Sequence, residues 1–486
     1  MDESRVPVIV GVGQVNDRDD RLNAIELMAA ALRNADANAG GGWLSRADTL
    51  DVVAQLSFPE FADASAPLAQ MLEIAPRHCA QTRYPMGDSP VALLDAAAQR
   101  IVSGQADVCV VAGGEALRTA AKRAVGKRDA VRDSATQATR ATRPGRERYG
   151  VIAPTDVYPL YENACRAMWG QTFAEAQHES AAIWARFSEV AALNEAAWLR
   201  ETRTAEAILT VTPSNRAIAF PYTKYMVANA SVNQGAGFIV TSLAKAKQMG
   251  VAETQLVYVG HGAAGREPGD VLTREHLNHS PSLERTLRST LKANGLNTTD
   301  LDHVELYSCF PCVPKMARRA IDWPLDKPMS VSGGLTFGGG PVGNYMSHAI
   351  AAMTQALRAS GRHGLLFGNG GFATTSHAII VSRDPAIAMR GAPAPPPSLE
   401  QQRIEVLESY EGEASIETYT VFYDRAGEAA SGVIVARAPN GARFLARVDG
   451  DDETLIAFLT SGESEPVGAR GAASLGADGL VHWRMS

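Results

Sequence analysis

The sequence predicts an α/β protein built from two similar halves, followed by a small all-β domain. Three observations support this prediction. Short apolar segments alternate with helical patterns, which is typical of parallel sheets covered by helices. The same order of elements returns from Gln255 onward, which indicates an internal repeat. Beyond the Pro-rich stretch Gly391–Ser398 the pattern changes to short alternating strands.

The first half alternates buried strands with helices. Its strands are apolar without a polar face, as expected for strands covered on both sides. We expect strands at Val8–Val12, Asp51–Gln55, Asp107–Ala112 and Phe238–Ser242, and a helix at Ala24–Arg33. The stretch Leu117–Ala228 breaks this rhythm with helical segments and loops, so we interpret it as an insertion.

A second helix of the first half, Val91–Val102, has clear boundary signals. Ser89 is predicted to be its N-cap, Pro90 suits its first position, and Gly104 ends it. The helix body is mostly apolar, so we expect it to be buried on several sides.

The second half repeats this order, and the C-terminal part is different. The repeat contains expected strands at Gln255–Gly260, Asp302–Tyr307, Gly364–Gly368 and Ser376–Ser382, and a helix at Tyr345–Ala359. The C-terminal part contains expected strands at Ile416–Tyr423, Gly432–Ala438, Arg443–Val448 and Leu480–Arg484, with a short helix near Glu453–Leu459. Short strands at this density predict a small barrel or sandwich.

Composition excludes several classes of function. The formal net charge of −7 gives no global reason to expect nucleic acid or membrane as a partner. The apolar run Val8–Val12 is too short for a signal-peptide core, and no apolar stretch is long enough to span a bilayer. Five cysteines are few and odd in number, which suits a reducing compartment. We expect a cytoplasmic protein, and no metal-binding spacing is present.

Three segments resemble a known family. Gly87–Ala116 resembles the thiolase segment in which Cys-x-Ser opens a buried helix and the next strand ends in Gly-Gly-x-Glu. Ser332–Asn344 resembles the thiolase motif Gly-Gly-x-x-x-x-Gly-His-Pro-x-Gly. Glu305–Pro311 resembles the His-Asp-Cys-Phe motif of the sterol-carrier type of thiolase. The C-terminal part resembles the additional β domain of thiolase-like proteins of type one.

The resemblance implies a thiolase fold. This fold consists of two fused βαβαβαββ halves in a five-layer α/β/α/β/α core, here with a small C-terminal antiparallel β-barrel. The expected domains are 1–247 for the N-terminal half, with an inserted loop region at about 117–228, then 248–384 for the C-terminal half, 385–399 for a Pro-rich linker and 400–486 for the barrel.

The departures from the family motifs fall at positions that thiolases use for catalysis. The nucleophilic cysteine falls on Gly87, the oxyanion-hole residue on Tyr307, the histidine of Gly-His-Pro on Gly340, and the second cysteine near Gly368. Thiolysis needs a covalent acyl carrier and a base, and glycine supplies neither. Losing a nucleophile typically costs a factor of roughly 10⁴–10⁶. We also expect these glycines to open space for a bulkier acyl chain.

We therefore predict a thiolase-like protein, similar to acetyl-CoA acetyltransferase, that lacks the Cys/His/Cys set. The favoured function is binding of acyl-CoA without thiolase activity, which implies a role in lipid metabolism. A scaffold or interaction subunit with a vestigial pocket is an alternative, with a protein partner recruited through the C-terminal β domain. An acyltransferase using a non-cysteine mechanism is a second alternative. No cofactor is required, and coenzyme A or acyl-CoA is the possible ligand.

The candidate pocket residues are Ser89, Tyr307, Cys309, Asn344 and Asn369. Ser89, at a helix N-terminus, could replace the nucleophile, although an N-cap is the simpler interpretation. Cys309 belongs to a Cys-x-x-Cys sequence that fits redox pairing or half a metal site. Without a second such pair, structural cysteines are the simpler interpretation. The glycine turn after Asn369 could form an oxyanion cradle from backbone N–H groups.

A basic run lies in the predicted insertion. Arg118–Arg148 contains ten Lys or Arg residues against three acidic ones. Such a run is often only a solvated surface segment, but it could also attract the phosphates of coenzyme A. Arg128 and Arg132 are the candidate phosphate-binding residues. Nucleic acid is disfavoured because aromatic residues do not alternate with the basic ones.

Overall fold

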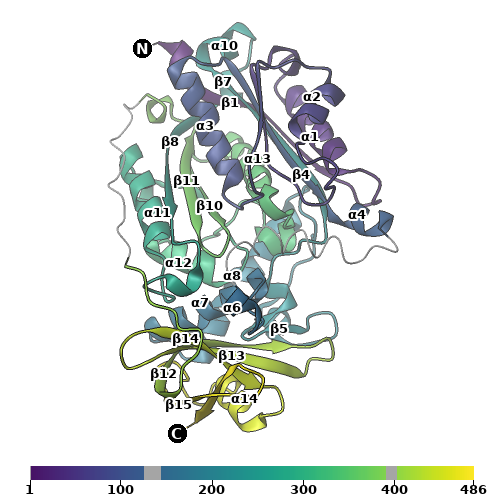
Figure 1. The fold of residues 1–486 in the computed structure, drawn as a ribbon. Coiled ribbons are helices and arrows are strands. Elements are labelled where there is room, and N and C mark those ends of the chain that lie inside the picture. The colour runs from purple at the N-terminus through teal and green to yellow at the C-terminus, as the bar shows by residue number, and fades with distance from the viewer. Residues whose placement is uncertain (1, 125–143, 390–401, 486) are drawn as a thin grey trace.

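The computed structural model describes residues 2–124, 144–389 and 402–485. Its largest element is a nine-stranded sheet in which two half-sheets meet along β1 and β8 (Figure 1). In spatial order the strands are β3 (His78–Gln81), β2 (Thr49–Val52), β4 (Val108–Ala116), β7 (Asn233–Ser242), β1 (Pro7–Asn16), β8 (Val257–Arg266), β11 (Thr375–Ser382), β10 (His363–Gly370) and β9 (His303–Leu306). Every strand predicted in the two halves is present.

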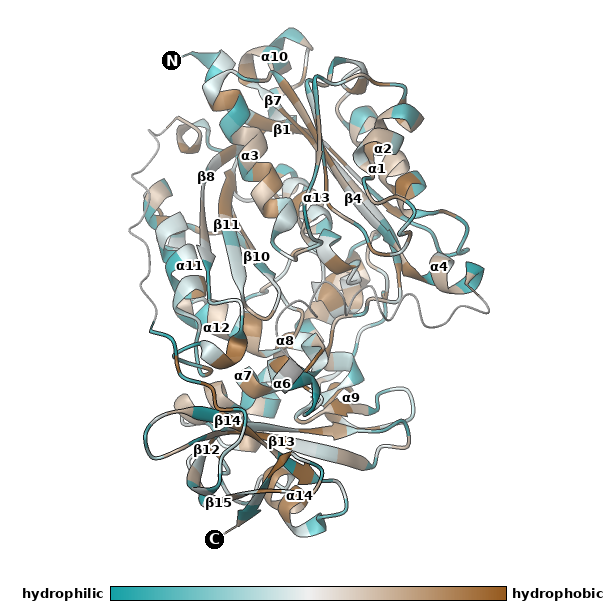
Figure 2. Cartoon of the chain, in the orientation of Figure 1, coloured by the Kyte–Doolittle hydropathy of each residue, from teal (hydrophilic) through white to brown (hydrophobic). Residues whose placement is uncertain are grey.

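The core has the five layers that the family resemblance implies. Helices α3 and α13 contact each other and both half-sheets, so they form a buried central layer. Helices α1 and α2 cover the outer face of the first half-sheet, and α11 and α12 cover that of the second. Their bounds are α1 (Ala24–Asn38), α2 (Ser65–Leu72), α3 (Ser89–Ser103), α11 (Pro281–Asn294), α12 (Cys312–Ala320) and α13 (Tyr345–Ala359). Figure 2 shows hydrophobic colour along the inner strands and hydrophilic colour on the outer turns of α11.

The second half departs from the βαβαβαββ order at one strand. In the first half β3 lies at the edge beside β2, whereas the segment 329–332 takes the equivalent place beside β9 without forming a strand. It is joined to β9 by a hydrogen bond from Leu306 N to Met329 O of 2.9 Å. Gly333 and Gly334 follow with φ of 97° and 71°, a left-handed backbone that glycine adopts without strain and that turns the chain away from the sheet.

Helix α3 begins one residue earlier than its boundary signals suggest. Its N-cap is Asp88 rather than Ser89, which is the first helical residue. Asp88 has an αR backbone, and its side chain makes no capping hydrogen bond. Pro90 is the second helical residue rather than the first, whereas Gly104 ends the helix as predicted, with a φ of 69°. The N-cap prediction for Ser89 is therefore wrong, because the Asp88 backbone already adopts the turn that precedes the helix.

The insertion between β4 and β7 forms a helical layer below the sheet (Figure 1). Helix α8 is its longest element and begins with a capping box between Thr172 and Glu175. The described elements are α4 (Leu117–Arg123), α6 (Pro144–Glu147), α7 (Pro154–Met168), α8 (Phe173–Leu193), α9 (Ala205–Leu209), β5 (Ala217–Ala219) and β6 (Tyr222–Thr223).

The C-terminal region closes into a five-stranded barrel. Its strands follow the order β12-β13-β14-β16-β15 and return to β12. They are β12 (Gly412–Tyr423), β13 (Ala429–Arg437), β14 (Arg443–Asp449), β15 (Arg470–Leu475) and β16 (Val481–Met485), with α14 (Glu453–Thr460) between β14 and β15. The pair β14–β16 is parallel, so the barrel is not wholly antiparallel as predicted. The connection between the two parallel strands runs through α14 and β15.

The barrel is attached to the insertion and the core through shared hydrogen bonds. Strand β12 continues the sheet into β5, where Phe220 N donates to Val421 O at 2.8 Å. The fully buried Arg443 donates to Arg274 O at 2.7 Å and to Glu417 Oε2 at 2.7 Å. The outer side chains Val433, Val435 and Leu445 pack into the main hydrophobic core. This face of the barrel is therefore occupied within the molecule. The Pro-rich stretch Gly391–Ser398 lies outside the described residues, and the predicted domain boundaries stay predictions.

Candidate ligand site at the N-terminus of helix α3

The structure brings three of the four predicted catalytic positions together. A Cβ atom placed on Gly87 would lie 2.5 Å from Cζ of Tyr307 and closer still to its hydroxyl oxygen. A Cβ atom on Gly368 would lie 3.3 Å from the carbonyl oxygen of Gly87. Three segments therefore converge on one point: the turn before α3, the start of the segment after β9, and the end of β10. The placement of thiolase catalytic positions on these residues stays a prediction.

Tyr307 occupies the space that a side chain on residue 87 would need. Cβ atoms in proteins essentially never come within 3.0 Å of a heavy atom of another residue in this way. The carbonyl oxygen of Asn369 also lies within 3.0 Å of the place of a Cβ on Gly87. Gly87 is thus the residue that lets the phenol ring and the β10 backbone approach. The expectation that glycine opens space at Gly87 is wrong, because the phenol of Tyr307 fills it.

Asp88 fills the space beside Gly368 in the same way. A Cβ on Gly368 would lie 2.8 Å from Cα of Asp88 and 3.2 Å from its Cβ. The Asp88 carboxyl reaches on to Gly370, where Oδ1 accepts a hydrogen bond of 2.9 Å from the hydroxyl of Thr375. The Cα and Cβ atoms of Asp88 therefore occupy the space beside Gly368, and its carboxyl lies beside Gly370.

Gly340 packs against the insertion. Its N–H donates to Asn229 O at 2.9 Å, and a Cβ would lie 3.4 Å from Cβ of Ala228. The four-residue stretch after it leads to Asn344, whose amide carbon lies 2.5 Å from the place of a Cβ on Gly113. Neither polar atom of the buried Asn344 amide has a hydrogen-bond partner. Asn344 is thus a buried polar group on the β4 side of the site.

Aromatic and amide groups form the wall behind Tyr307. The hydroxyl of Tyr158 donates to Gly371 O at 2.7 Å and accepts 2.9 Å from Nδ2 of Asn369. The Tyr158 ring stacks on Phe310, with ring centroids 4.6 Å apart. Cys309 lies next to this stack. Asn369 is thereby held by Tyr158, and its backbone carbonyl faces Gly87.

Burial controls the ionisation of these groups. Burial raises the pKa of the Tyr307 phenol well above its ordinary value, and the charges of Cys309 and Asp88 act in the same direction. Burial raises the pKa of the Cys309 thiol to about 12. Burial also raises the pKa of Asp88, against the hydrogen bond from Thr375. These shifts favour the neutral forms of the phenol and the thiol at neutral pH.

Ser89, the Cys-x-x-Cys sequence and the nearby His348 have structural roles. Ser89 is buried, and its hydroxyl donates only a long 3.5 Å hydrogen bond to Tyr84 O. All five cysteines are free thiols, so the Cys-x-x-Cys sequence forms no disulfide. His348 on α13 is buried against Gln14, at 2.8 Å, and burial lowers its pKa to about 3. In the described ranges no group of three or more His, Cys, Asp or Glu side chains is placed to hold a metal ion.

Arg128 and Arg132 lie outside the described residues, so their predicted phosphate contacts are untested. The described basic residues of the same run are engaged within the molecule. Arg118 donates to Asp20 at 2.8 Å, and Arg148 donates to Gly479 O at 2.7 Å. The predicted attraction for phosphates therefore rests on the part of the run between α4 and α6.

The sequence reasoning missed Asp88 as a site residue. A signal was present, because an acidic residue directly before a Ser-Pro helix start would ordinarily cap the helix. That its side chain turns to the β10–β11 turn depends on Gly368 and Gly370, which lie far away in the sequence. Only tertiary structure shows this contact.

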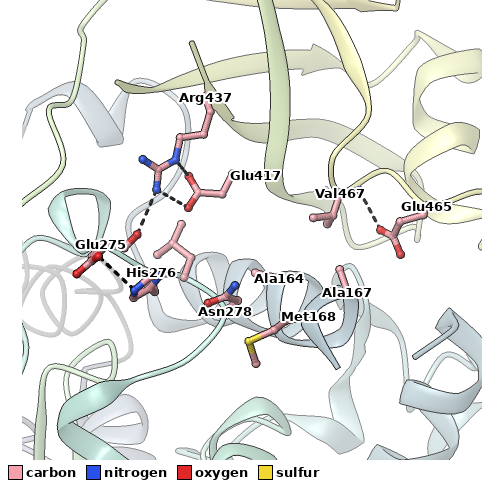
Figure 3. Close-up of a pocket in the computed structure, with 11 residues that line it drawn as sticks. Ala164, Ala167, Met168, Glu275, His276, Asn278, Glu417, Arg437, Glu465 and Val467 are labelled. Carbon is pink, nitrogen blue, oxygen red and sulfur yellow. Dashed lines mark hydrogen bonds and ion pairs between the residues drawn. The ribbon is translucent and has the colours of Figure 1, made fainter. Parts of the chain in front are cut away.

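A separate pocket lies between the barrel and the core (Figure 3). It has a volume of about 540 Å³ and is lined by α7, the segment 275–278 and the barrel. Its carboxylates are paired: Glu417 accepts from Arg437 at 2.8 Å, and Glu465 accepts from Arg166 at 2.7 Å. The Glu417 and Glu465 carboxylates of this pocket are thus each held by an arginine.

Comparisons with known proteins agree with this architecture. Residues 397–478 match the family described as the thiolase-like protein type 1 additional C-terminal domain. The chain is 29% identical to a monomeric SCP2-thiolase like protein type 1 from Mycobacterium smegmatis, over 100% of both chains, with a TM-score of 0.83.

Two thiolases share the fold at lower identity. Human mitochondrial 3-ketoacyl-CoA thiolase is 14% identical, with 78% of this chain and 99% of that chain covered and a TM-score of 0.60. The dimeric peroxisomal thiolase of Saccharomyces cerevisiae is 13% identical, with coverages of 78% and 98% and a TM-score of 0.58. No curated protein sequence matches the chain. The chain therefore resembles a thiolase-like protein of type 1 over its full length, and its C-terminal region matches the additional domain described for such proteins.

Proposed function

We propose that this protein binds an acyl-CoA in the cytoplasm without thiolase activity. The absence of thiolase activity is proposed from one observation. The phenol of Tyr307 occupies the place of a side chain on residue 87. A thiolase needs a nucleophile there to hold the acyl group between two half-reactions. With glycine at this position and Cys309 neutral, no described side chain around Tyr307 can serve as that carrier.

Two features support acyl-CoA as the ligand. The fold is shared with a protein named a 3-ketoacyl-CoA thiolase, and the insertion that covers the site is retained. The basic run within the insertion supplies cations for the phosphates of coenzyme A. We expect a dissociation constant from micromolar to sub-millimolar, which is about 4–8 kcal/mol of binding free energy.

Calorimetry with coenzyme A and a panel of acyl-CoAs tests this proposal. We expect heat of binding that weakens from low to physiological salt, because phosphate contacts are screened. Replacing Arg128 and Arg132 together by Ala should weaken binding, whereas replacing Arg447 on the barrel by Ala should leave it unchanged. No binding of any CoA ester at millimolar concentration in low salt would overturn the proposal.

A second candidate is a scaffold or interaction subunit. The close packing of Tyr307 against Gly87 favours this function, because a protein that carries out no reaction needs no open space for a reacting acyl group. The barrel face formed by Val433, Val435 and Leu445 is already packed into the core, so a partner would have to use another surface. Failure of all CoA esters to bind would favour this function.

In the described part of the chain, no helix combines the length and the apolar character needed to cross a bilayer.

A further inference from the structure

A cleft of about 730 Å³ lies between β1, the C-terminal halves of α1 and α13, and the end of α8. Its volume falls in the range of about 300–1,000 Å³ that is usual for small-molecule sites. None of the residues that line it belongs to the candidate pocket around Tyr307. The cleft is therefore a further candidate site, and the ligand that it suits depends on its lining.

The lining of this cleft is rich in carboxamides and poor in charge. In the described part of the chain, six of its sixteen residues are Asn or Gln, one is Glu195, and none is Lys or Arg. A carboxamide offers a donor and an acceptor without carrying charge. The cleft thus suits an uncharged ligand that forms hydrogen bonds, because a phosphate or carboxylate would meet no cation among these lining residues.

Two of the amides are held by the fold and form a fixed wall. Asn16 Nδ2 donates to Ala196 O at 3.0 Å, and Asn16 Oδ1 accepts from Gln234 Nε2 at 2.9 Å. Asn194 Nδ2 donates to Ser332 O at 3.0 Å, and Asn194 Oδ1 accepts from Ala196 N at 3.0 Å. These four hydrogen bonds join the segment after α8 to β1, so the shape of the cleft is set before a ligand arrives.

Three exposed amides keep hydrogen-bonding groups for a ligand. Asn34 donates through Nδ2 to Gln14 O at 3.2 Å, which leaves its Oδ1 as an acceptor. Asn38 accepts through Oδ1 from Val12 N at 3.2 Å, which leaves its Nδ2 as a donor. The side chain of Gln355 makes no hydrogen bond within the described ranges. Donors and acceptors are thus mixed along the rim of the cleft.

Apolar side chains supply the floor of the cleft and part of its rim. Val12 and Ala352 are buried and form the floor. Leu193, the last residue of α8, lies at the rim and is 87% exposed, more than any other large hydrophobic side chain of the described residues. A ligand with an apolar face would remove this leucine from water, which favours binding.

We propose that this cleft binds an uncharged polyhydroxylated ligand, a sugar of about the size of a hexose. Each sugar hydroxyl is both a donor and an acceptor, so it matches the free Oδ1 of Asn34 as well as the free Nδ2 of Asn38. The C–H face of the sugar ring would lie on Leu193, and the Glu195 carboxylate would accept hydrogen bonds from hydroxyl groups. This site is independent of the proposed binding of acyl-CoA.

Saturation-transfer NMR with the full-length protein tests this proposal. The probes are methyl glucoside, methyl galactoside and methyl mannoside. We expect saturation transfer to at least one of them, with a dissociation constant of about 1 mM. Binding should stay unchanged from low to physiological salt, because no ion pair contributes to it. Methyl glucuronide should bind more weakly, because the Glu195 carboxylate repels its carboxylate.

Variants of the cleft locate the binding site. Gln355→Leu should weaken binding about three- to tenfold through lost hydrogen bonds, and Ala356→Phe should abolish it by filling the cleft. Gln70→Leu, which changes an exposed amide on α2, is the matched control and should bind as the wild type does. Melting temperatures show that each variant is folded.

Two results would overturn the proposal. One is the absence of saturation transfer to all three neutral probes, and the other is unchanged binding by Ala356→Phe. Either result leaves the proposed binding of acyl-CoA standing, because the cleft shares no residue with the candidate pocket around Tyr307.

Discussion

At the scale of single residues, the candidate site is defined by glycines that admit other side chains. Gly87 admits Tyr307, Gly368 and Gly370 admit Asp88, and Gly113 admits Asn344. In each case a Cβ would overlap an atom already present. The glycines therefore reflect close packing, and each one can be tested by adding a single methyl group.

Gly87→Ala should destabilise the protein. The added Cβ would overlap Tyr307 and the backbone carbonyl of Asn369, and overpacking of this kind typically costs about 1–3 kcal/mol. Gly269→Ala is the matched control, because a Cβ there meets nothing within 4 Å. Thermal unfolding should show a lower melting temperature for Gly87→Ala alone. Equal melting temperatures for the two variants would show that Tyr307 does not fill this space.

Glu115, at the end of β4, predicts a pH dependence of stability. It is buried, its Oε2 has no hydrogen-bond partner, and burial raises its pKa to about 8 from an ordinary value of 4.5. The folded state therefore holds a proton that the unfolded state loses, and stability falls as pH rises from about 5 to 8. Each unit of pKa shift corresponds to roughly 1.4 kcal/mol.

Glu115→Gln should remove this dependence, because the amide carries no proton to lose. Its melting temperature should exceed that of the wild type by an amount that grows between pH 5 and pH 8.5. Melting curves that shift in parallel over this range would show that the Glu115 carboxyl ionises normally.

The sequence predicted the backbone of this site better than its side chains. Motif spacing placed Gly87, Gly368 and Tyr307, and the structure brings them together. The sequence could not show that Tyr307 packs against Gly87 or that Asp88 packs against Gly368 and Gly370, because both contacts join segments far apart in the chain. The N-cap of α3 was also predicted one residue too late. Ser89 and Asp88 are both good N-cap residues, and only the backbone turn decides between them.

At the scale of elements, the strands and central helices followed from hydrophobic pattern, and the attachment of the barrel did not. Apolar runs predicted every strand of the two halves that packs between helices. The edge strand β3 is half exposed and lacks that pattern, and β15 contains no β-branched or aromatic residue, so neither was predicted. The joining of β5 to β12 is a long-range pairing that local sequence does not encode.

Arg443 should be a main anchor of the barrel. It is fully buried and bonds to Glu417 and to the Arg274 carbonyl of the core. Arg443→Met leaves Glu417 with one cation fewer and that carbonyl unpaired, which should cost roughly 3–5 kcal/mol. Arg447→Met, which removes an exposed pair with Asp449, should cost less than about 1 kcal/mol. Urea unfolding measures both, and equal midpoints would rule out Arg443 as an anchor.

At the scale of the whole molecule, the barrel and the thiolase core depend on each other unequally. The barrel encloses a hydrophobic cluster of its own, whereas Val433, Val435 and Leu445 on its outer face belong to the main core. The core side of this contact includes the insertion that covers the candidate site. Loss of the barrel should therefore affect the core more than the reverse.

Separate expression of residues 400–486 and 1–399 tests this asymmetry. The barrel fragment should give a dispersed amide spectrum, because its strands close on their own cluster. The core fragment should melt well below the full-length protein, because its contacts with β12 and Arg443 are lost. An undispersed spectrum for the barrel, or an unchanged melting temperature for the core, would contradict the asymmetry.

The most direct test of the central claim is a thiolysis assay. Purified full-length protein is incubated with acetoacetyl-CoA and coenzyme A, and the formation of acetyl-CoA is followed by chromatography. We expect no cleavage above a heat-denatured control. Gly87→Cys should not restore it, because Tyr307 still occupies the place of the thiol and Gly340 and Gly368 supply neither base nor acid. A clear enzymatic rate that is lost on substitution of Tyr307 or Cys309 would contradict the claim that this thiolase-like protein does not act as a thiolase.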